Sequence, residues 1–220
     1  CTGVCGYEVD GGVQRILTGL REGVSLSLLD GKRGDIGSTM TAYAHTYRSP
    51  DRPLRADAIT VSPFLGFGTL RPAVDLAHET GRGLFVLTLT SNPEGAQVQH
   101  AMREGLTVAG SIVDGVTSAN APDAIAEVLG SVGMVVGATV GEAVRKLGLD
   151  LAGANAPLLA PGVGAQGATA GDLVTVLGRA SGNVLASSSR EILGAGPDCA
   201  ALRAAARQMA QQLGVILSSS

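Results

Sequence analysis

Aromatic and lysine side chains are scarce in this sequence of 220 residues. Aromatics make up 3% of the chain, tryptophan is absent, and Lys32 and Lys146 are the only lysines among 16 lysines and arginines. The formal net charge is -3, and no basic block occurs. Nucleic-acid binding requires a basic surface and, for single strands, aromatic stacking platforms. The composition therefore argues against a nucleic-acid partner, and a lysine inside a motif becomes conspicuous.

Long apolar runs, a signal sequence and spaced metal ligands are also missing. The sequence contains no run of roughly 18 apolar residues, which a membrane span requires. It also contains no basic segment followed by an apolar one, so it predicts no signal peptide. Cys1, Cys5 and Cys199 lack the spacing of a zinc site or a disulfide framework. We therefore expect a cytoplasmic, enzyme-like domain without a metal site.

Apolar segments alternate with segments of helical periodicity along most of the chain, which is 45% hydrophobic. The predicted strands cover residues 24–29, 58–61, 84–89, 132–138, 157–160 and 183–187. The predicted helices cover residues 13–20, 38–47, 70–78, 95–103, 108–129 with a break at 120–122, 141–147, 170–179 and 200–213. Short apolar strands that alternate with helices indicate a parallel sheet covered on both faces.

Two α/β architectures fit this alternation, a doubly wound sheet and a (β/α)8 barrel. No GxGxxG motif follows a strand, so the dinucleotide-binding form of the first lacks its fingerprint. A glycine-rich loop, 161–167, follows the fifth predicted strand, and Arg190 follows the sixth. Barrels commonly bind phosphate in the loops after strands seven and eight. We therefore predict that residues 1–220 form a single (β/α)8 TIM barrel domain that contains strands three to eight and lacks the first two β/α units.

One charged cluster, 28–39, follows the first predicted strand. Asp30 and Lys32 are two residues apart, so their side chains point the same way in an extended strand, and Asp35 follows three residues later. At the carboxyl end of a barrel strand this direction is the active site. The two carboxylates bracket one ammonium and keep it charged. The alternative is a surface salt-bridge cluster followed by a helix cap at Ser38.

Two later segments together predict a phosphate site. The glycines of 161–167 let backbone N–H groups approach an anion, and Gln166 adds a side-chain amide. Arg190 stands at the start of a predicted helix and can bind a phosphate through two parallel hydrogen bonds. The alternatives are an ordinary glycine-rich turn and a solvated arginine.

The segment after the third predicted strand has two interpretations. Ser91 and Asn92 lie at the strand end and could bind a planar amide, with the following residues 93–95 as the start of a mobile lid. The same Ser-Asn-Pro run is also typical of a helix cap and turn. The sequence does not decide between them.

Five motifs resemble those of orotidine 5'-phosphate decarboxylases, specifically the bacterial type 2 branch. DGKRGDIGST at 30–39 is similar to that family's Asp-x-Lys-x-x-Asp motif, with Gly31 where alanine is usual. The other four motifs follow in the family's order; they are ADAITVSPFLGFGTLRP at 56–72, TSNPEGAQ at 90–97, PGVGAQG at 161–167 and NVLASSSREI at 183–192. The resemblance implies a (β/α)8 barrel that forms a homodimer with active sites at the interface. It implies a carbon–carbon lyase of pyrimidine biosynthesis, which converts orotidine 5'-phosphate to uridine 5'-phosphate without metal or organic cofactor.

The resemblance also implies roles for individual residues. Lys32 becomes the proton donor to C6 of the pyrimidine, Asp30 holds Lys32 near the substrate carboxylate, and Asp35 reaches the partner subunit's site. The substrate-binding residues implied by the resemblance are Ile36 and Thr39 beside Asp35, Ser91 and Asn92 at the pyrimidine, and Pro161, Gln166 and Arg190 at the phosphate.

The start of the chain departs from the family pattern. The sequence begins with Cys1 and has no clear periodicity over its first twelve residues, which we interpret as a truncated or processed start. The family's first strand carries an aspartate for the ribose, its second strand carries a further lysine, and neither is found here. An open sheet exposes its edge, so we expect this chain alone to fold poorly. Two alternatives therefore stay open: an inactive subunit that binds nucleotide, and a magnesium-dependent sugar-phosphate decarboxylase or aldolase of the same suprafamily.

Overall fold

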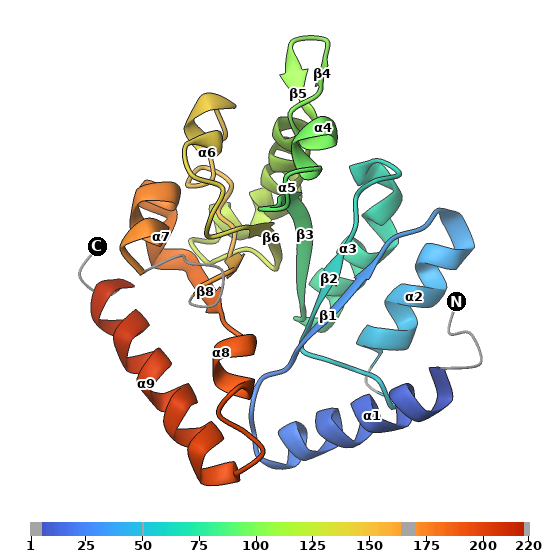
Figure 1. The fold of residues 1–220 in the computed structure, drawn as a ribbon. Helices are drawn as coiled ribbons and strands as arrows, with labels where there is room; N and C mark the ends of the chain where they lie inside the picture. Colours follow the sequence, from blue (N-terminus) through green and yellow to red (C-terminus); the bar gives the residue numbers. More distant parts are fainter. Residues whose placement is uncertain (1–5, 50, 164–169, 218–220) are drawn as a thin grey trace. The chain divides into compact units, whose positions relative to one another are not determined.

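The computed structural model describes residues 6–49, 51–163 and 170–217 (Figure 1). Its internal contacts divide the chain into two compact units, residues 1–86 and 87–220. Strand β3 (Gly83–Leu89) crosses the boundary, so its first part belongs to the first unit and its end to the second.

The first unit alternates helices with parallel strands. Its elements are α1 (Gly6–Glu22), β1 (Leu28–Arg33), α2 (Gly37–Arg48), β2 (Ala58–Val61), the 3-10 helix η1 (Phe67–Leu70), α3 (Arg71–Thr80) and the start of β3. β1 pairs with β2, and β2 pairs with β3, in parallel. In α2 the buried residues Met40, Ala44 and Tyr47 recur at helical spacing and form one apolar face. Burial of this face explains why α2 packs beside α3.

The second unit has the same alternation. Its elements after β3 are α4 (Gly95–Gln99), β4 (Met102–Arg103), β5 (Leu106–Thr107), α5 (Val108–Ile125), β6 (Val132–Val136), α6 (Ala143–Lys146), β7 (Leu158–Pro161), α7 (Ala170–Leu177), the 3-10 helix η2 (Gly178–Asn183), β8 (Val184–Ser187), α8 (Arg190–Leu193) and α9 (Cys199–Leu217). β6, β7 and β8 are parallel, and β4 and β5 form an antiparallel hairpin. All five residues of β6 are buried, as expected for a parallel strand covered on both faces.

The predicted α/β fold with parallel strands is confirmed. Some helix ends are shifted, as in α1, which begins at Gly6 rather than at residue 13, and three elements differ more strongly. The first strand runs over Leu28–Arg33 rather than residues 24–29. Val24 adopts a left-handed conformation (φ 54°), which interrupts an extended chain, and Ser27 is buried against Asp57. The polar residues that follow enter the strand instead, because β2 supplies their hydrogen-bond partners.

The other two differences lie after β3. The predicted helix at 95–103 ends at Gln99, and the hairpin β4–β5 follows it. Its turn residues Glu104 and Gly105 both have positive φ (57° and 84°), which suits a tight hairpin turn. The predicted break at 120–122 is absent, because α5 continues past Pro122 to Ile125. Pro122 has no N–H to donate to the carbonyl four residues earlier, so α5 continues past it without that hydrogen bond.

Candidate active site

The Asp30–Lys32 pair is formed at the end of β1. The Lys32 ammonium makes an ion pair and a hydrogen bond with Oδ2 of Asp30. The register of β1 against β2 shifts between Leu29 and Arg33, and Lys32 has a positive φ of 45°. Such irregularities re-aim side chains and occur at functional sites, where a strained backbone is retained. Asp30 and Lys32 are both exposed, so the ion pair is open to a ligand.

Thr60 on β2 connects the two residues of this pair. Its hydroxyl donates to Oδ1 of Asp30 (2.8 Å) and accepts the backbone N–H of Lys32 (3.0 Å). Only 1% of Thr60 is exposed, so both hydrogen bonds are shielded on the threonine side. Sequence reasoning missed Thr60, although a hydroxyl between apolar residues of a predicted buried strand is a usable signal.

The environment of Asp30 favours its charged form. Partial burial raises the pKa of its carboxyl group, but hydrogen bonds from Lys32 and Thr60 and the charge of Lys32 outweigh that effect, and the pKa lies below its ordinary value of 3.8. At neutral pH the carboxylate is therefore an anion that orients the Lys32 ammonium. A held ammonium of this kind can stabilise developing negative charge and can donate a proton.

Asp35 does not contribute a second carboxylate to Lys32 within one chain. Its Oδ1 accepts the backbone N–H of Ile36 (2.8 Å), so the carboxylate is turned toward its own loop. Among the described residues, Lys32 is ion-paired with Asp30, whereas Asp35 bonds to its own loop; the role of Asp35 beside Lys32 stays a prediction. Ile36 is 59% exposed and is the cap residue before α2. The predicted cap at Ser38 is wrong, because Ser38 lies inside the helix. Thr39 is exposed in the first turn of α2.

Neighbouring side chains fix the loop between β1 and α2. The guanidinium group of Arg33 lies 5.7 Å from the ring of Tyr43 and 5.8 Å from the ring of Tyr47, both on α2, and its Nε donates to the Tyr47 hydroxyl (3.2 Å). Gly34 passes close to β2, where a Cβ atom would lie 2.3 Å from the carbonyl oxygen of Ser62. This close approach requires glycine in the motif.

In the second unit, the loop after β3 forms a hydrogen-bonded turn. The Thr90 hydroxyl donates to Oδ1 of Asn92 (2.7 Å), and Nδ2 of Asn92 donates to Glu94 (3.2 Å). Gln99 of α4 accepts the Thr90 N–H (2.9 Å) and donates to its hydroxyl (2.7 Å). Asn92 therefore lies in a turn, as one interpretation predicted, but the predicted helix cap is wrong, since the cap residue of α4 is Glu94 and no side chain caps it. The contact of Asn92 with substrate stays a prediction. No pattern in the sequence predicted that Gln99 would support this turn.

The end of β6 approaches this loop closely. A Cβ atom at Gly137 would lie 3.0 Å from the backbone nitrogen of Ser91 and 3.1 Å from its Cβ, so only glycine fits without displacement. The Gly137 N–H donates to the Leu89 carbonyl (2.8 Å), and the next N–H, of Ala138, donates to the Pro161 carbonyl (2.9 Å). These bonds bring the ends of β3, β6 and β7 together in the second unit.

The ends of β7 and β8 are also neighbours. Pro161, the last residue of β7, is paired with Ser187, the last residue of β8, and Arg190 follows as the exposed first residue of α8. The buried hydroxyl of Ser188 has no hydrogen-bond partner among the described residues. Gln166 lies outside the described residues. Pro161 therefore lies beside the end of the strand that leads to Arg190, and the phosphate site stays a prediction.

Two further properties concern ligands and membranes. Within residues 6–49, 51–163 and 170–217, no three His, Cys, Asp or Glu side chains are grouped in a way that could hold a metal ion. In the same part of the chain, every helix is too short or too polar to cross a lipid bilayer.

Comparison with known proteins gives the family. A sequence model of the orotidine 5'-phosphate decarboxylase / HUMPS family matches residues 5–205. The orotidine 5'-phosphate decarboxylase of Salinispora arenicola is 55% identical over 202 residues, which cover 91% of this chain and 70% of that protein. That of Streptomyces coelicolor is 52% identical and is matched over 89% of this chain and 68% of its own length.

Structural comparison agrees with the sequence matches. A crystal structure of a Streptomyces avermitilis protein has a TM-score of 0.89 and 48% identity, covering 97% of this chain and 73% of that one. The match by family sequence, by relatives above 50% identity and by fold extends over most of the chain. The chain therefore belongs to the orotidine 5'-phosphate decarboxylase / HUMPS family.

Proposed function

We propose that this chain decarboxylates orotidine 5'-phosphate to uridine 5'-phosphate, as a carbon–carbon lyase of pyrimidine biosynthesis. Its similarity to the decarboxylases of Salinispora arenicola and Streptomyces coelicolor supports this reaction. The observation that carries the proposal is the Lys32 ammonium held by Asp30 at the end of β1. This ion pair supplies the cation that the reaction needs.

The proposed reaction breaks one bond and forms another at C6 of the pyrimidine. The bond from C6 to the carboxylate breaks, CO2 leaves, and the electron pair stays on C6. The Lys32 ammonium then gives its proton to C6, and the resulting amine regains a proton from water. A preorganised cation stabilises the negative charge that develops on C6 more strongly than mobile water does. Asp30 orients the ammonium, and Thr60 holds Asp30 and the backbone of Lys32.

We assign the remaining residues of the motif to a site shared between two subunits. In a homodimer, Asp35, Ile36 and Thr39 of one subunit would reach the partner's substrate. Two observations support this assignment: the Asp35 carboxylate is not engaged with Lys32 of its own chain, and Ile36 presents an exposed apolar side chain. A dimer interface at this position would remove the apolar surface of Ile36 from water.

The residues of the second unit are proposed to bind the rest of the nucleotide. Arg190, Gln166 and Pro161 take the phosphate, and Ser91 and Asn92 take the pyrimidine. The pairing of Pro161 with Ser187 and the unpartnered hydroxyl of Ser188 support a polar ligand near α8. Because the Asn92 amide already bonds to Thr90 and Glu94, its contact with the pyrimidine requires an exchange of hydrogen bonds.

We further propose that both units belong to one (β/α)8 barrel domain. The continuity of β3 across the boundary between the units supports this proposal, because a single strand links them. In such a barrel the active site lies at the carboxyl ends of the strands, where Lys32 and Arg190 stand in their own units.

A direct assay tests the proposed function. Provided that it folds without the family's first two strands, the purified chain should bind uridine 5'-phosphate and reduce the absorbance of orotidine 5'-phosphate as the pyrimidine loses its carboxylate. Binding without turnover would contradict the proposal in favour of an inactive, nucleotide-binding subunit. Turnover that a chelator abolishes would point instead to magnesium-dependent chemistry.

A further inference from the structure

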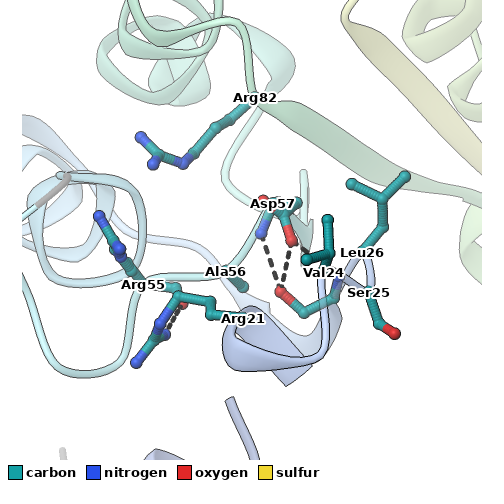
Figure 2. A pocket seen from close by; sticks show the side chains of 9 residues that line it. Arg21, Val24, Ser25, Leu26, Arg55, Ala56, Asp57 and Arg82 are labelled. Atoms are coloured by element: carbon teal, nitrogen blue, oxygen red, sulfur yellow. Dashed lines mark hydrogen bonds between the residues drawn. The ribbon is translucent and has the colours of Figure 1, made fainter. Parts of the chain in front are cut away.

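Three arginines line a cavity in the first unit that the proposed reaction does not use (Figure 2). The cavity has a volume of about 330 Å³. Ser27, Asp57 and Arg82 in its wall directly precede β1, β2 and β3. The starts of parallel strands share one edge of a sheet, so this cavity lies at the opposite edge from Lys32, about 15 Å away along β1.

The guanidinium groups come from three different elements. Arg21 lies on α1, Arg55 on the loop before β2, and Arg82 before β3, and Figure 2 shows the three side chains on the same side of the pocket. Hydrogen bonds to the chain hold Arg21 and Arg82 in place. Arg21 donates to the Arg55 carbonyl (3.0 Å) and the Thr18 hydroxyl (2.8 Å), and Arg82 donates to the Arg48 carbonyl (2.6 Å). Since a guanidinium has five N–H donors, Arg21 and Arg82 keep donors for a ligand.

Asp57 is the single acid in the cavity wall, and its carboxylate is already engaged. Its Oδ2 accepts both the backbone N–H and the hydroxyl of Ser27, each at 2.8 Å. Partial burial raises the pKa of Asp57, but the hydrogen bonds from Ser27 and the charge of Arg82 lower it below its ordinary value. The carboxylate is therefore charged at neutral pH, and it offsets one of the three arginine charges.

A fourth arginine adds positive charge beside the cavity. Arg48 is buried and donates to the carbonyls of Gly83 (2.6 Å) and Arg82 (2.5 Å). Burial and the charge of Arg82 lower the pKa of Arg48 to about 10, so Arg48 remains a cation at neutral pH. Three arginines and one acid thus line the cavity, and Arg48 adds a fourth arginine beside it.

We propose that this cavity is a second anion site, which binds the phosphate group of a small phosphorylated molecule independently of the active site. Arginine is suited to this ligand because its planar donors match two phosphate oxygens at once. The cavity volume is at the lower end of the range for small-molecule sites, so the cavity can hold a phosphate or pyrophosphate group with part of the molecule that carries it. The excess charge matches a dianion.

Titration calorimetry with inorganic pyrophosphate tests the proposal on the chain and its variants. Arg55→Gln should weaken binding on the order of tenfold, as for loss of a charge-assisted hydrogen bond. Asp57→Asn should strengthen binding several-fold, because it removes a like charge while its amide oxygen can still accept from Ser27. Arg103→Gln is the matched control, since Arg103 is an exposed arginine outside the cavity, and it should leave the affinity unchanged.

The active-site arginine separates the two sites. The pyrophosphate binding that Arg55→Gln weakens should be retained by the Arg190→Ala variant, since Arg190 belongs to the proposed substrate site. The proposal is overturned if the unaltered chain binds no pyrophosphate at tens of millimolar, or if Arg190→Ala abolishes all binding while Arg55→Gln does not change it. A thermal melt verifies that each variant is folded. If Arg55→Gln does not fold, the tighter binding expected of Asp57→Asn decides, and an unchanged affinity in that variant contradicts the proposal.

Discussion

The Thr60 hydroxyl on β2 donates a hydrogen bond of 2.8 Å to the Asp30 carboxylate on β1. The same hydroxyl accepts the backbone N–H of Lys32, so one buried threonine holds both members of the ion pair. The position of the ammonium therefore depends on a residue outside the charged motif.

Replacing Thr60 by valine tests this dependence. Thr60→Val keeps the shape but leaves the Lys32 N–H and one Asp30 oxygen without their partner. We expect a loss of about 1–3 kcal/mol in the free energy of unfolding, as for an unsatisfied buried group, together with a lower kcat. Urea unfolding and a decarboxylase assay measure the two effects. Thr60→Ser keeps the hydroxyl and should retain most of the stability and most of kcat. If Thr60→Val and Thr60→Ser behave alike, the hydroxyl does not hold the ion pair.

The lowered pKa of Asp30 predicts how stability varies with pH. A carboxyl group whose pKa is lower in the folded state stabilises the fold above its unfolded pKa, near the ordinary value of 3.8. That contribution is lost as the pH falls through the folded-state pKa. The difference in unfolding free energy between the unaltered chain and Asp30→Asn should therefore be constant at neutral pH and shrink below about pH 4. A difference that grows on acidification would contradict the assignment.

Replacement by alanine should affect two glycines of the motif to different extents. A Cβ atom at Gly31 would meet only the flexible end of Ile59 at 3.3 Å, whereas one at Gly34 would lie 2.3 Å from the backbone oxygen of Ser62. We expect Gly31→Ala to change the free energy of unfolding by less than about 1 kcal/mol, and Gly34→Ala to cost about 1–3 kcal/mol or more. Urea unfolding of both variants provides the comparison, and similar costs would show that the close approach at Gly34 is not required.

Arg190 should act on binding more than on chemistry. Arg190→Ala is expected to raise KM for orotidine 5'-phosphate roughly ten- to hundredfold, as for loss of a charge-assisted hydrogen bond, with a smaller change in kcat. Glu191→Ala, the next residue of α8, is the matched control and should leave KM near its original value. A fall in kcat alone, with KM unchanged, would place Arg190 elsewhere than at the phosphate.

The sequence predicted the fold class because its apolar runs are long enough to mark buried parallel strands. The five buried residues of β6 are the clearest example. It misplaced β1, because Asp30 and Lys32 look unlike strand residues until β2 supplies Thr60 as their partner. It missed the hairpin β4–β5, because strands of two residues have no measurable periodicity and Glu104-Gly105 is a less common turn pair than Asn-Gly.

The candidate site was predictable where a motif carries it and not where packing does. Asp30 and Lys32 were found from their spacing, and their contact is present. Gln99 and Gly137 support the loop of Ser91 through contacts between segments far apart in the sequence, which no local pattern reveals. The turned carboxylate of Asp35 likewise depends on the loop conformation rather than on residue type.

The two lysines of the chain allow the most direct test of the account. Lys32 is held by Asp30, while Lys146 pairs with Glu142 on the exposed helix α6. In a decarboxylase assay, Lys32→Ala should reduce kcat for orotidine 5'-phosphate by several orders of magnitude, while uridine 5'-phosphate still binds and Lys146→Ala keeps the original rate. A Lys32→Ala variant that turns over as fast as Lys146→Ala would contradict the central claim.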